Sequence, residues 1–355
     1  MNGFAPLGYQ RIIADLDEQL QYVEPDLRSL SGCHLFLTGG TGFVGSWLLE
    51  SLLHANQRCD LGIRATVLTR DPAAFALKYP HLAQSAHLDF VCGDVRALPS
   101  TLGKFDAMIH AATPASADLN HNAPLEMLDT IIDGGRAVMD LAAQSGNIPL
   151  LFTSSGAVYG KAPAGLSSFT ETYLGGPDPL SPKVAYHEGK RVGEFQCAVA
   201  HQRSGIQPKI ARLFAFVGPY LPLDRHLAVG NFLADVHAGR SICMTGDGTT
   251  VRSYQYASEM ATWLWAILVR GEALRAYNVG SEEAVTMREL AELAAATVSP
   301  RVSVEVRGVS VPGQLVDRYV PSTQRAREEL GLLSRIPIRE SLSRTLDYLR
   351  GYQGH

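Results

Sequence analysis

The sequence has little of several features that mark specialised classes of protein. Acidic and basic residues nearly balance in its 355 residues, which carry a formal net charge of −4. We find no basic patch or stripe of the kind that nucleic-acid-binding proteins carry. We therefore expect neither a nucleic acid nor an anionic membrane surface as a partner. Hydrophobic residues make up 46% of the chain, which is ample for a large core.

Membrane and secretion signals are absent from the sequence as well. No apolar run reaches the roughly 18–20 residues of a membrane-spanning helix, and the longest one, around Met260–Val269, is predicted to be a buried helix. The first residues lack the basic segment and the apolar segment of a signal peptide. The sequence therefore predicts a cytoplasmic protein without a membrane partner.

Cysteine is too scattered for a disulfide framework or a zinc site. None of the five cysteines stands in a CxxC spacing, and several lie in apolar runs, where small buried hydrophobic residues are expected. They are Cys33, Cys59, Cys92, Cys197 and Cys243. We expect free thiols, as in a reducing cytoplasm, and no bound metal.

The chain divides into an N-terminal extension and two larger parts. Residues 1–31 predict a helix because apolar residues recur at helical spacing, and Pro25 is expected to end it. Residues 32–219 alternate short apolar segments with amphipathic ones, and residues 220–355 follow with looser order and more turn signals. The apolar positions of the extension are Ile12, Ile13, Leu16, Leu20 and Val23.

The alternation over residues 32–219 predicts a doubly wound parallel sheet, the α/β architecture of the Rossmann fold. Strands are expected at His34–Thr38, Ile63–Leu68, Leu88–Cys92, Ala107–Ala111, Leu150–Thr153 and Lys209–Phe214. Helices are expected around Trp47–Leu53, Met127–Ala143 and Tyr186–His201. Residues 220–355 are predicted to form mainly a smaller C-terminal substrate-binding lobe, with helices near Ser258–Val269, Met287–Thr297 and Ser341–Tyr348.

A glycine-rich turn follows the first predicted strand. Gly39, Gly42 and Gly45 stand in a GxxGxxG spacing between that strand and the next helix. Glycines in such a turn allow a tight bend, the approach of the backbone to a pyrophosphate and close helix–strand packing. The N-terminus of the helix offers free N–H groups to the anion. The turn, which includes Phe43 and Val44, therefore predicts a dinucleotide-binding site.

The residues after the next two strands bear on which dinucleotide binds. An acidic residue after the second strand would bind the adenosine ribose and favour NAD, but Thr69 stands there. Arg70 suits a ribose 2′-phosphate, which slightly favours NADP, and Asp71 before a proline is typical of a turn. After the third strand, Asp94, with Val95 beside it, either holds the adenine edge or caps the next turn. NAD and NADP both stay open.

Tyr186 and Lys190 form a YxxxK pair on one face of a predicted helix. A tyrosine is a poor base because its ordinary pKa is about 10. A nearby ammonium group and a positive nicotinamide ring would stabilise the phenolate and lower this pKa. Tyr186 is then suited to take the proton of a sugar hydroxyl as hydride leaves the carbon.

The strand before this helix ends in hydroxyl side chains, Thr153, Ser154 and Ser155. Ligands of doubly wound sheets bind at the carboxyl ends of the strands. Ser155 is predicted to hydrogen-bond the reacting oxygen beside Tyr186, and Thr153 to line the cofactor. Ser154 is interpreted as a turn residue that satisfies the backbone.

Together these residues resemble the extended short-chain dehydrogenases/reductases of the NAD-dependent epimerase/dehydratase family, which modify sugar nucleotides. The similarity covers about His34 to Gly331 and is greatest to UDP-glucuronate decarboxylases, dTDP-glucose 4,6-dehydratases and UDP-sugar 4-epimerases. The segments YHEGKR at 186–191 and GDGTTVRSYQYASE at 246–259 look most like those of the decarboxylases. The blocks that carry the similarity are TGGTGFVG at 38–45, HAATPAS at 110–116, SSGAVYG at 154–160, YHEGKR at 186–191, ARLFAFVGP at 211–219 and GDGTTVRSYQYASE at 246–259.

The resemblance implies a catalytic triad of Ser155, Tyr186 and Lys190 and a nucleoside-diphosphate sugar as the substrate. It also implies a homodimer that forms through helices flanking the sheet. The arginines suit a diphosphate, which needs cations. Along the cofactor the resemblance places Ala111, Ala112 and Thr113, and around the substrate Thr113, Ser155, Asn231, Arg252 and Arg318.

Departures from the family pattern bear on the reaction. Decarboxylases and dehydratases of this type carry an acidic residue after the catalytic hydroxyl, in SEVYG or DEVYG, whereas this chain has Gly156 and Ala157. Dehydration across neighbouring carbons needs an acid and a base at that place. The asparagine that the family carries after the later strand is Ala215 here.

We therefore hypothesise a nucleoside-diphosphate-sugar 4-epimerase, because epimerisation needs only hydride transfer and the tyrosine. One alternative is an NADPH-dependent 4-ketoreductase of a deoxy sugar nucleotide, which Arg70 would favour. Another is a UDP-glucuronate decarboxylase or 4,6-dehydratase with a changed acid–base group. A catalytically silent dinucleotide-binding protein is the alternative outside enzymes, since a fold does not fix a function, and the Tyr186–Lys190 pair argues against it.

Overall fold

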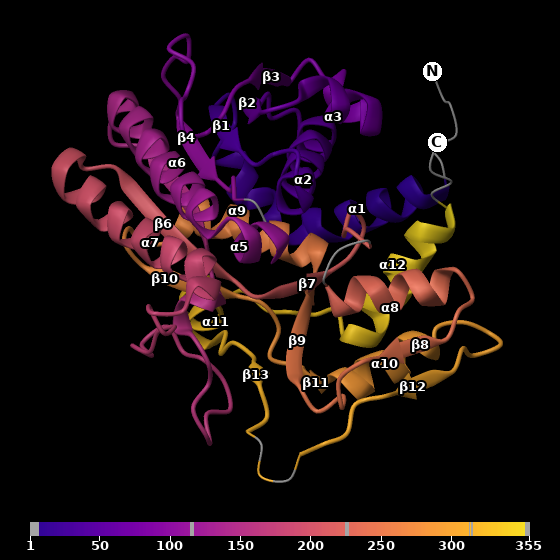
Figure 1. Cartoon of the computed structure of the whole chain (residues 1–355). Helices are drawn as coiled ribbons and strands as arrows, with labels where there is room; N and C mark the ends of the chain where they lie inside the picture. Colours follow the sequence, from indigo (N-terminus) through magenta and orange to yellow (C-terminus); the bar gives the residue numbers. More distant parts are fainter. Residues whose placement is uncertain (1–6, 114–116, 224–226, 312, 314, 352–355) are drawn as a thin grey trace.

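A parallel sheet with helices on both faces forms the main body of the protein, and a smaller lobe lies beside it (Figure 1). The structure is a computed structural model and describes residues 7–113, 117–223, 227–311, 313 and 315–351. Residues 1–6 of the predicted extension and residues 114–116 of the HAATPAS block lie outside the described residues.

The strands of the main sheet run parallel in the order β10-β6-β5-β4-β1-β2-β3. The chain builds outward from β1 to β3 and then returns to the other side of β1 to begin β4. β1 and β4 therefore flank the switch point, where doubly wound sheets bind their ligands. The predicted fold class is confirmed. The strands are β1 (His34–Thr38), β2 (Arg64–Thr69), β3 (Leu88–Cys92), β4 (Ala107–His110), β5 (Pro149–Ser155), β6 (Gln207–Leu213) and β10 (Ala276–Val279).

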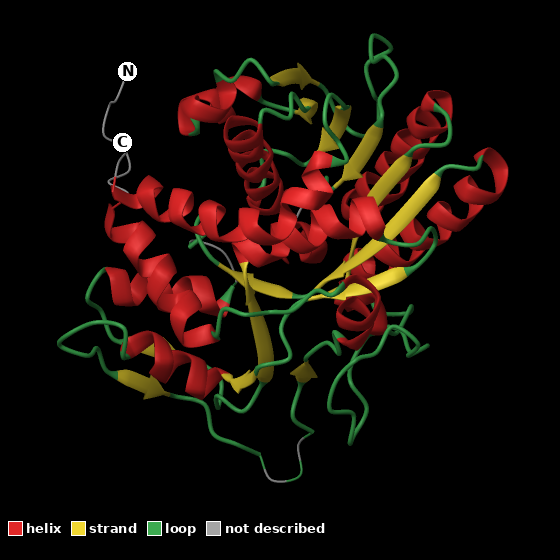
Figure 2. Cartoon of the chain, turned by 180° about the vertical axis from the view of Figure 1, so that it is seen from behind, coloured by secondary structure: helices red, strands yellow, loops and turns green. Residues whose placement is uncertain are grey.

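Helices cover both faces of this sheet (Figure 2). α2 (Phe43–Cys59) and α9 (Ala257–Arg270) share one core with the strands, and α6 (Pro124–Ser145) packs on α7 (Ala185–Ser204) over another. α9 is buried almost throughout, as the apolar run predicted. Among the described residues, no helix combines the length and the apolar character that a bilayer crossing requires.

The smaller lobe has a core of its own, built around two short sheets. Its strands are β7 (Ala215–Val217), β8 (Ile242–Met244), β9 (Val251–Tyr256), β11 (Ala284–Thr286), β12 (Val304–Val306) and β13 (Arg318–Tyr319), and its helices are α8 (Ala228–His237) and α10 (Met287–Ala295). The part of the chain predicted to be mainly this lobe also supplies β10 and α9 to the main body. The chain therefore passes between the two units more than once.

The remaining elements of the described residues lie between or after those already named. They are α3 (Pro72–Lys78), α4 (Pro80–Ala83), α5 (Ala117–Asn122), the 3₁₀ turns Gly156–Tyr159 and Pro182–Val184, α11 (Gln324–Leu330) and α12 (Ile338–Gly351).

The predicted N-terminal helix is α1 (Leu7–Arg28), which packs against α2, α9 and α12. The predicted end at Pro25 is wrong, because the helix continues to Arg28. Leu27, beyond the proline, is fully buried. Packing of this last turn therefore outweighs the backbone hydrogen bond that Pro25 cannot donate.

A buried carboxylate fastens α1 to the rest of the protein. Asp15 is 0% exposed, accepts a hydrogen bond of 2.6 Å from Tyr256 Oη and one of 2.9 Å from Arg344, and pairs with Arg11 at 2.7 Å. Since α12 supplies Arg344 and β9 supplies Tyr256, this one side chain joins three distant segments.

We expect Asp15→Ala to lower the free energy of unfolding by about 3–5 kcal/mol, because it leaves buried partners without their anion. The matched control is Glu24→Ala on the same helix, where a 38% exposed side chain pairs with Arg28, and it should cost less than about 1 kcal/mol. Urea unfolding measures both. Equal losses would show that Asp15 does not anchor α1.

Candidate active site

The glycine turn has the geometry that its spacing predicts. Gly39 has a φ of +75°, and a Cβ atom there would lie 2.5 Å from the carbonyl carbon of Ala111, so only glycine lets β1 turn against the end of β4. A Cβ atom at Gly45 would lie 2.3 Å from the Gly39 oxygen, which reflects close helix–strand packing. At Gly42 the nearest such contact is 3.4 Å, so the backbone there is open to a ligand.

The N-terminus of α2 follows this turn directly, at Phe43. Its N-cap, Gly42, has no side chain to accept from the first N–H groups, and the first turn contains no acidic residue. These N–H groups and the positive end of the helix dipole therefore suit an anion. Phe43 and Val44 are half-buried beside it. The residues present fit the pyrophosphate of a dinucleotide.

The residues predicted to bind the adenosine end lie after β2 and β3. Arg70 is exposed, whereas Asp71 caps α3 by accepting from Ala74 N–H at 2.8 Å. Asp94 forms two side-chain hydrogen bonds with Arg96, at 3.0 and 2.8 Å, which lower the pKa of Asp94 to about 2. Its carboxylate is therefore ionised and already engaged, and its contact with adenine stays a prediction.

Val95 is buried, at 8% exposure, and packs toward Gly134 of α6, where a Cβ atom would lie 2.8 Å from the Val95 side chain. Its side chain therefore contributes to the core beneath the predicted adenosine site.

The end of β4 lines the other side of the switch point. Ala111 N–H donates to the Thr38 carbonyl at 3.1 Å, and Ala112 N–H donates to the Thr38 hydroxyl at 3.3 Å. The next residue, Thr113, accepts a hydrogen bond of 2.8 Å from Lys190 Nζ. The segment predicted to lie along the cofactor thus connects the glycine turn to Lys190.

The structure brings Ser155, Tyr186 and Lys190 together, as predicted. Ser155 ends β5, and Tyr186 and Lys190 lie in the first turns of α7. Burial raises the pKa of Tyr186, and the neighbouring Ser155 hydroxyl opposes this rise. Lys190 Nζ lies 5.9 Å from the centre of the Tyr186 ring. One hydroxyl and one cation therefore adjoin the phenol.

Lys190 is buried, and two hydrogen bonds fix the position of its ammonium group. It is 3% exposed, and its ammonium group donates to the Thr153 carbonyl at 2.6 Å and to the Thr113 hydroxyl at 2.8 Å. Burial lowers the pKa of Lys190 to about 7, although Glu194 nearby favours the charged form. Lys190 therefore titrates close to neutral pH in the protein without a ligand.

The buried environment of Tyr186 disfavours ionisation of its phenol. Burial raises its pKa above the ordinary value of 10.0, and the neighbouring Ser155 hydroxyl opposes the rise. A phenolate at neutral pH therefore requires a further positive charge beside the ring. The charged form of Lys190 and a cationic nicotinamide are both suited to supply it.

The other hydroxyls of the β5 end have structural partners. Thr153 donates to the His110 carbonyl at 3.1 Å, and Ser154 donates to Glu194 at 2.5 Å. Glu194 in turn pairs with Arg212 at 2.7 Å. The interpretation of Ser154 as a turn residue that satisfies the backbone is wrong, because Ser154 lies within β5 and donates to the Glu194 side chain. Thr153 contributes the carbonyl that binds Lys190.

Sequence reasoning missed one residue of this site, Tyr319. Its hydroxyl donates to the Leu213 carbonyl at 3.4 Å and would lie 2.6 Å from a Cβ atom at Gly156, the residue after Ser155. β13, which carries Tyr319, is two residues long and joins the lobe sheet by pairing with β9. No local pattern marks so short a strand.

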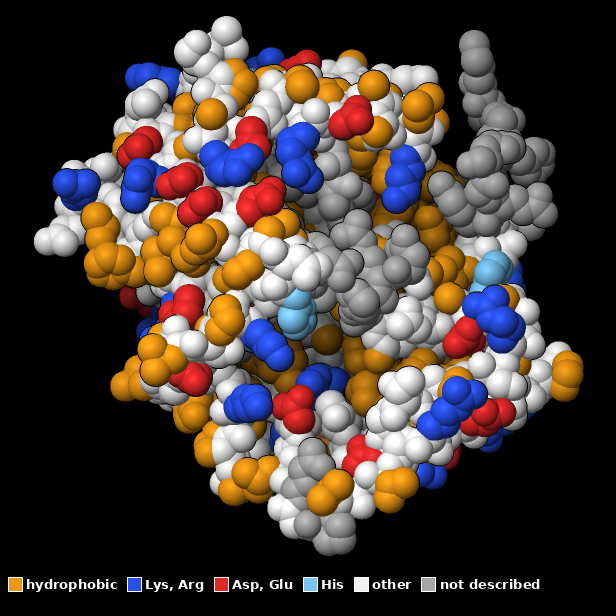
Figure 3. Space-filling model, viewed as in Figure 1, with side chains coloured by type: hydrophobic (Ala, Val, Ile, Leu, Met, Phe, Trp, Pro, Cys, Tyr) orange, Lys and Arg blue, Asp and Glu red, His pale blue; other side chains and the backbone are white. Residues whose placement is uncertain are grey.

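A hollow separates the main body from the smaller lobe, with Lys and Arg side chains along its edge (Figure 3). Arg252 and Arg318 lie on the paired strands β9 and β13, and Arg252 is 5.8 Å from the Tyr319 ring. Arg252 pairs with Asp317 at 2.6 Å, and Arg318 donates to the Ser167 carbonyl. Asn231 is exposed on α8. Their predicted contact with a diphosphate stays a prediction.

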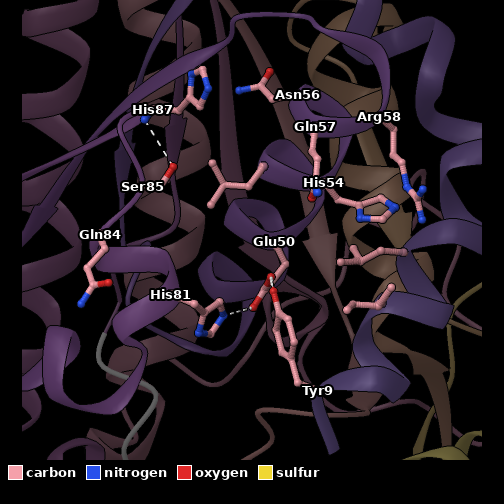
Figure 4. A pocket seen from close by; sticks show the side chains of 13 residues that line it. Tyr9, Glu50, His54, Asn56, Gln57, Arg58, His81, Gln84, Ser85 and His87 are labelled. Atoms are coloured by element: carbon pink, nitrogen blue, oxygen red, sulfur yellow. Dashed lines mark hydrogen bonds and ion pairs between the residues drawn. The ribbon is translucent and has the colours of Figure 1, made fainter. Parts of the chain in front are cut away.

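A second recess lies between α1, α2 and the segment around α4 (Figure 4). Its lining in the described residues includes none of the predicted site residues. Glu50, which is 2% exposed, accepts from Tyr9 at 3.0 Å, bonds His81 at 2.8 Å and also binds Tyr220. These contacts satisfy the buried carboxylate within the protein, so we assign the recess to the packing of α1.

Comparison with known proteins agrees with this geometry. A model described as the NAD dependent epimerase/dehydratase family matches residues 35–280. The chain is similar to UDP-glucuronic acid decarboxylase 1 of Arabidopsis thaliana, with 29% identity over 318 residues, which cover 89% of this chain and 69% of that protein.

Solved structures share the fold over most of the chain. The UDP-glucose 4-epimerase of Thermus thermophilus in complex with NAD is similar with a TM-score of 0.71 and 25% identity, covering 90% of this chain and 99% of that one. The dTDP-glucose 4,6-dehydratase of Streptomyces venezuelae with NAD and TYD bound has a TM-score of 0.74 and 24% identity, covering 89% and 97%.

Replacing Lys190 by Met should change how stability depends on pH. In the folded chain the pKa of Lys190 is about 7, against 10.5 for an ordinary lysine. Between these values the unfolded state binds more protons, so the destabilising effect of the buried ammonium falls as the pH rises. We expect cofactor-free wild-type protein to gain stability over Lys190→Met from pH 7 to 9, as urea unfolding would measure.

The control for this experiment is Lys104→Met at an exposed loop position. Its difference in stability from the wild type should stay the same across the pH range. A constant difference for Lys190→Met as well would contradict the lowered pKa of Lys190.

Proposed function

Because the chain belongs to the NAD dependent epimerase/dehydratase family, we propose that it is a nucleoside-diphosphate-sugar 4-epimerase, which acts by hydride transfer at a sugar carbinol. Its relatives are enzymes, among them decarboxylases of a UDP-sugar acid. The observation that carries the proposal is the convergence of Ser155, Tyr186 and Lys190 beside the open glycine turn.

The cofactor and the protein have separate tasks in this reaction. When bound, the dinucleotide supplies a nicotinamide that accepts and returns hydride. The turn from Gly39 to Gly45 and the N-terminus of α2 would hold its pyrophosphate, and Thr113 would lie alongside it. The chain itself must bind the sugar, orient its hydroxyl and move the proton.

Tyr186 is the group that moves the proton. Its phenolate oxygen takes the proton of the sugar hydroxyl during oxidation, and its phenol returns the proton during reduction. Ser155, whose hydroxyl adjoins Tyr186, would hold the same sugar oxygen. The Lys190 ammonium, fixed by Thr153 and Thr113, favours the phenolate.

Gly156 and Ala157 support epimerisation over dehydration. Elimination of water needs an acid and a base near the neighbouring carbons. The positions after Ser155 carry no ionisable side chain. A reaction that needs only one proton-transferring group at one oxygen suits these residues better.

Decarboxylation is the second candidate, and the similarity to UDP-glucuronic acid decarboxylases favours it. Once a neighbouring hydroxyl is oxidised to a ketone, loss of CO₂ from a sugar acid can proceed without the missing carboxylate, although more slowly. Reduction of a 4-keto sugar with NADPH is a further alternative, which the exposed Arg70 favours.

The smaller lobe would bind the nucleotide. We propose that Arg252, Arg318 and Asn231 contact the diphosphate, with Arg252 exchanging its pair with Asp317 for the ligand. The carboxylate of Asp317 is 56% exposed, so release of this pair costs little.

We also propose a homodimer through the helices that flank the sheet. Leu125 on α6 is 72% exposed and Phe195 on α7 is 67% exposed. Large apolar side chains on neighbouring helices are typical of a surface that another subunit covers.

A product assay decides among the three reactions. Purified protein should interconvert a UDP-hexose and its C4 epimer, detected by NMR, without added cofactor and without net change in cofactor absorbance. Mass spectrometry of the small molecules that co-purify would identify NAD or NADP. Release of CO₂ from UDP-glucuronate would establish the decarboxylase instead, and stoichiometric use of NADPH would establish the ketoreductase.

We expect Tyr186→Phe to reduce kcat at least about 100-fold, because it removes the group that transfers the proton. The dissociation constant for the cofactor should change less than about twofold, since the ring stays in place. Tyr173→Phe is the control, because Tyr173 packs on Phe169 and Tyr159. A fully active Tyr186→Phe protein would refute the assigned base.

A further inference from the structure

The first turn of α7 has no cap from its own sequence. The helix begins at Ala185, and its N-cap residue, Val184, makes no side-chain hydrogen bond. Tyr186 is the second residue of the helix. A side chain at the N-cap usually accepts from the N–H group of the second or third residue. The N–H group of Tyr186 therefore needs an acceptor from water or from another part of the chain.

Asn120 supplies this acceptor from α5. Its side-chain oxygen accepts from the Tyr186 N–H at 3.0 Å, and its side-chain nitrogen donates to the Lys183 carbonyl at 2.7 Å. Lys183 belongs to the 3₁₀ turn that leads into α7, and α5 packs against this turn and against α6. One half-buried amide thus joins the residues on both sides of Val184 to another helix.

The amide suits both of its partners. The Tyr186 N–H requires an acceptor, and the Lys183 carbonyl requires a donor. An asparagine side chain offers one of each on neighbouring atoms, whereas an aspartate offers acceptors alone. The residue type at position 120 therefore matches the backbone groups that it faces.

The connection between β4 and α6 contacts α7 at a second place as well. Thr113, just after β4, accepts from Lys190 Nζ at 2.8 Å. Lys190 lies four residues after Tyr186, which is about one turn of the helix. This connection therefore holds the side chain of Lys190 through Thr113 and the backbone of Tyr186 through Asn120.

The backbone of Tyr186 matters because of the role assigned to its phenol. A phenol that passes a proton to a sugar hydroxyl and takes it back must keep its oxygen accessible to the sugar. Its alignment must then come from the backbone that carries the ring. Tyr186 lies in the first turn of α7, and helix ends fray when nothing holds them.

Resting on the proposed function, we propose that Asn120 is a positioning residue of the active site, whose amide caps α7 at Tyr186 and keeps the phenol aligned with the sugar hydroxyl. A displacement of about 1 Å between reacting groups can slow a reaction about 100-fold. Asn120 acts on the reaction through the backbone of Tyr186.

Asn120→Ala tests this role, since it removes both hydrogen bonds. Amide exchange in the full chain, labelled with ¹⁵N-tyrosine, would follow the Tyr186 N–H, assigned by the signal lost in Tyr186→Phe. We expect this N–H to exchange at least about fivefold faster, as the loss of a helix cap implies. We expect kcat to fall about tenfold or more while KM for the sugar nucleotide stays within about twofold, because a displaced phenol slows the proton transfer.

Asn120→Asp is the rescue variant, because a carboxylate still accepts from the Tyr186 N–H but cannot donate to the Lys183 carbonyl. It should keep this N–H protected and have a kcat within about threefold of wild type, since aspartate caps helices as well as asparagine does. Each kcat is taken at the pH optimum of the variant, because the added negative charge raises the pKa of the nearby phenol.

The matched control is Asn122→Ala. Asn122 is an exposed asparagine on the same helix, so its replacement should change neither the exchange of the Tyr186 N–H nor kcat. Equal losses in Asn120→Ala and Asn122→Ala would overturn the proposal. A low kcat in Asn120→Asp with a protected Tyr186 N–H would overturn it as well.

The proposal also fails if folded Asn120→Ala protein shows an unchanged exchange rate at Tyr186, an unchanged kcat or a loss confined to KM. The exchange experiment needs no sugar substrate. If the wild type converts no nucleotide sugar, the proposed function fails, while the exchange rates still decide whether Asn120 holds Tyr186. If turnover is found and the exchange rate or kcat does not change, only the role of Asn120 fails.

Discussion

The burial of the Lys190 ammonium group determines how the carboxyl ends of β4 and β5 are arranged. Removing a charge from water costs several kcal/mol unless polar partners replace the water. Lys190 finds these partners in the Thr153 carbonyl, near the end of β5, and the Thr113 hydroxyl, just after β4. The two strand ends meet only because neighbouring strands of the sheet run parallel. The sheet is therefore a requirement for the charge beside Tyr186.

A second network holds the same strand end rigid. Ser154 donates to Glu194, which pairs with Arg212, and Arg212 donates to Tyr159, whose hydroxyl reaches Asn278 on β10. This chain of contacts joins β5, α7, β6 and β10. The two consecutive serines therefore have different roles. Ser154 joins β5 to α7 through Glu194, whereas Ser155 adjoins Tyr186. Catalytic groups need such support to keep their geometry.

Much of the main sheet could be predicted because its signals are local. The strand segments are short apolar runs, and the structure places their ends within a few residues of the expected ones. The YxxxK spacing likewise puts Tyr186 and Lys190 on one helix face without knowledge of the rest. The helix end at Pro25 was wrong, since the burial of Leu27 is a tertiary effect that no local rule contains.

Elements that depend on distant partners could not be predicted in this way. β10 has four residues and joins the main sheet only by pairing with β6, beyond the boundary expected at residue 219. α8 does carry a local signal that could have found it, with Val229, Phe232, Leu233 and Val236 at helical spacing. These two elements therefore differ, since β10 lacks a local signal whereas α8 carries one in its apolar spacing.

Position 156 shows why a motif alone gives an incomplete account of a site. Along the sequence, Gly156 shows only that the residue after Ser155 has no side chain. In space, a side chain at this position would collide with the ring of Phe214 and with the hydroxyl of Tyr319, which a two-residue strand brings from the smaller lobe. The space after Ser155 is therefore set by the smaller lobe as well as by the motif.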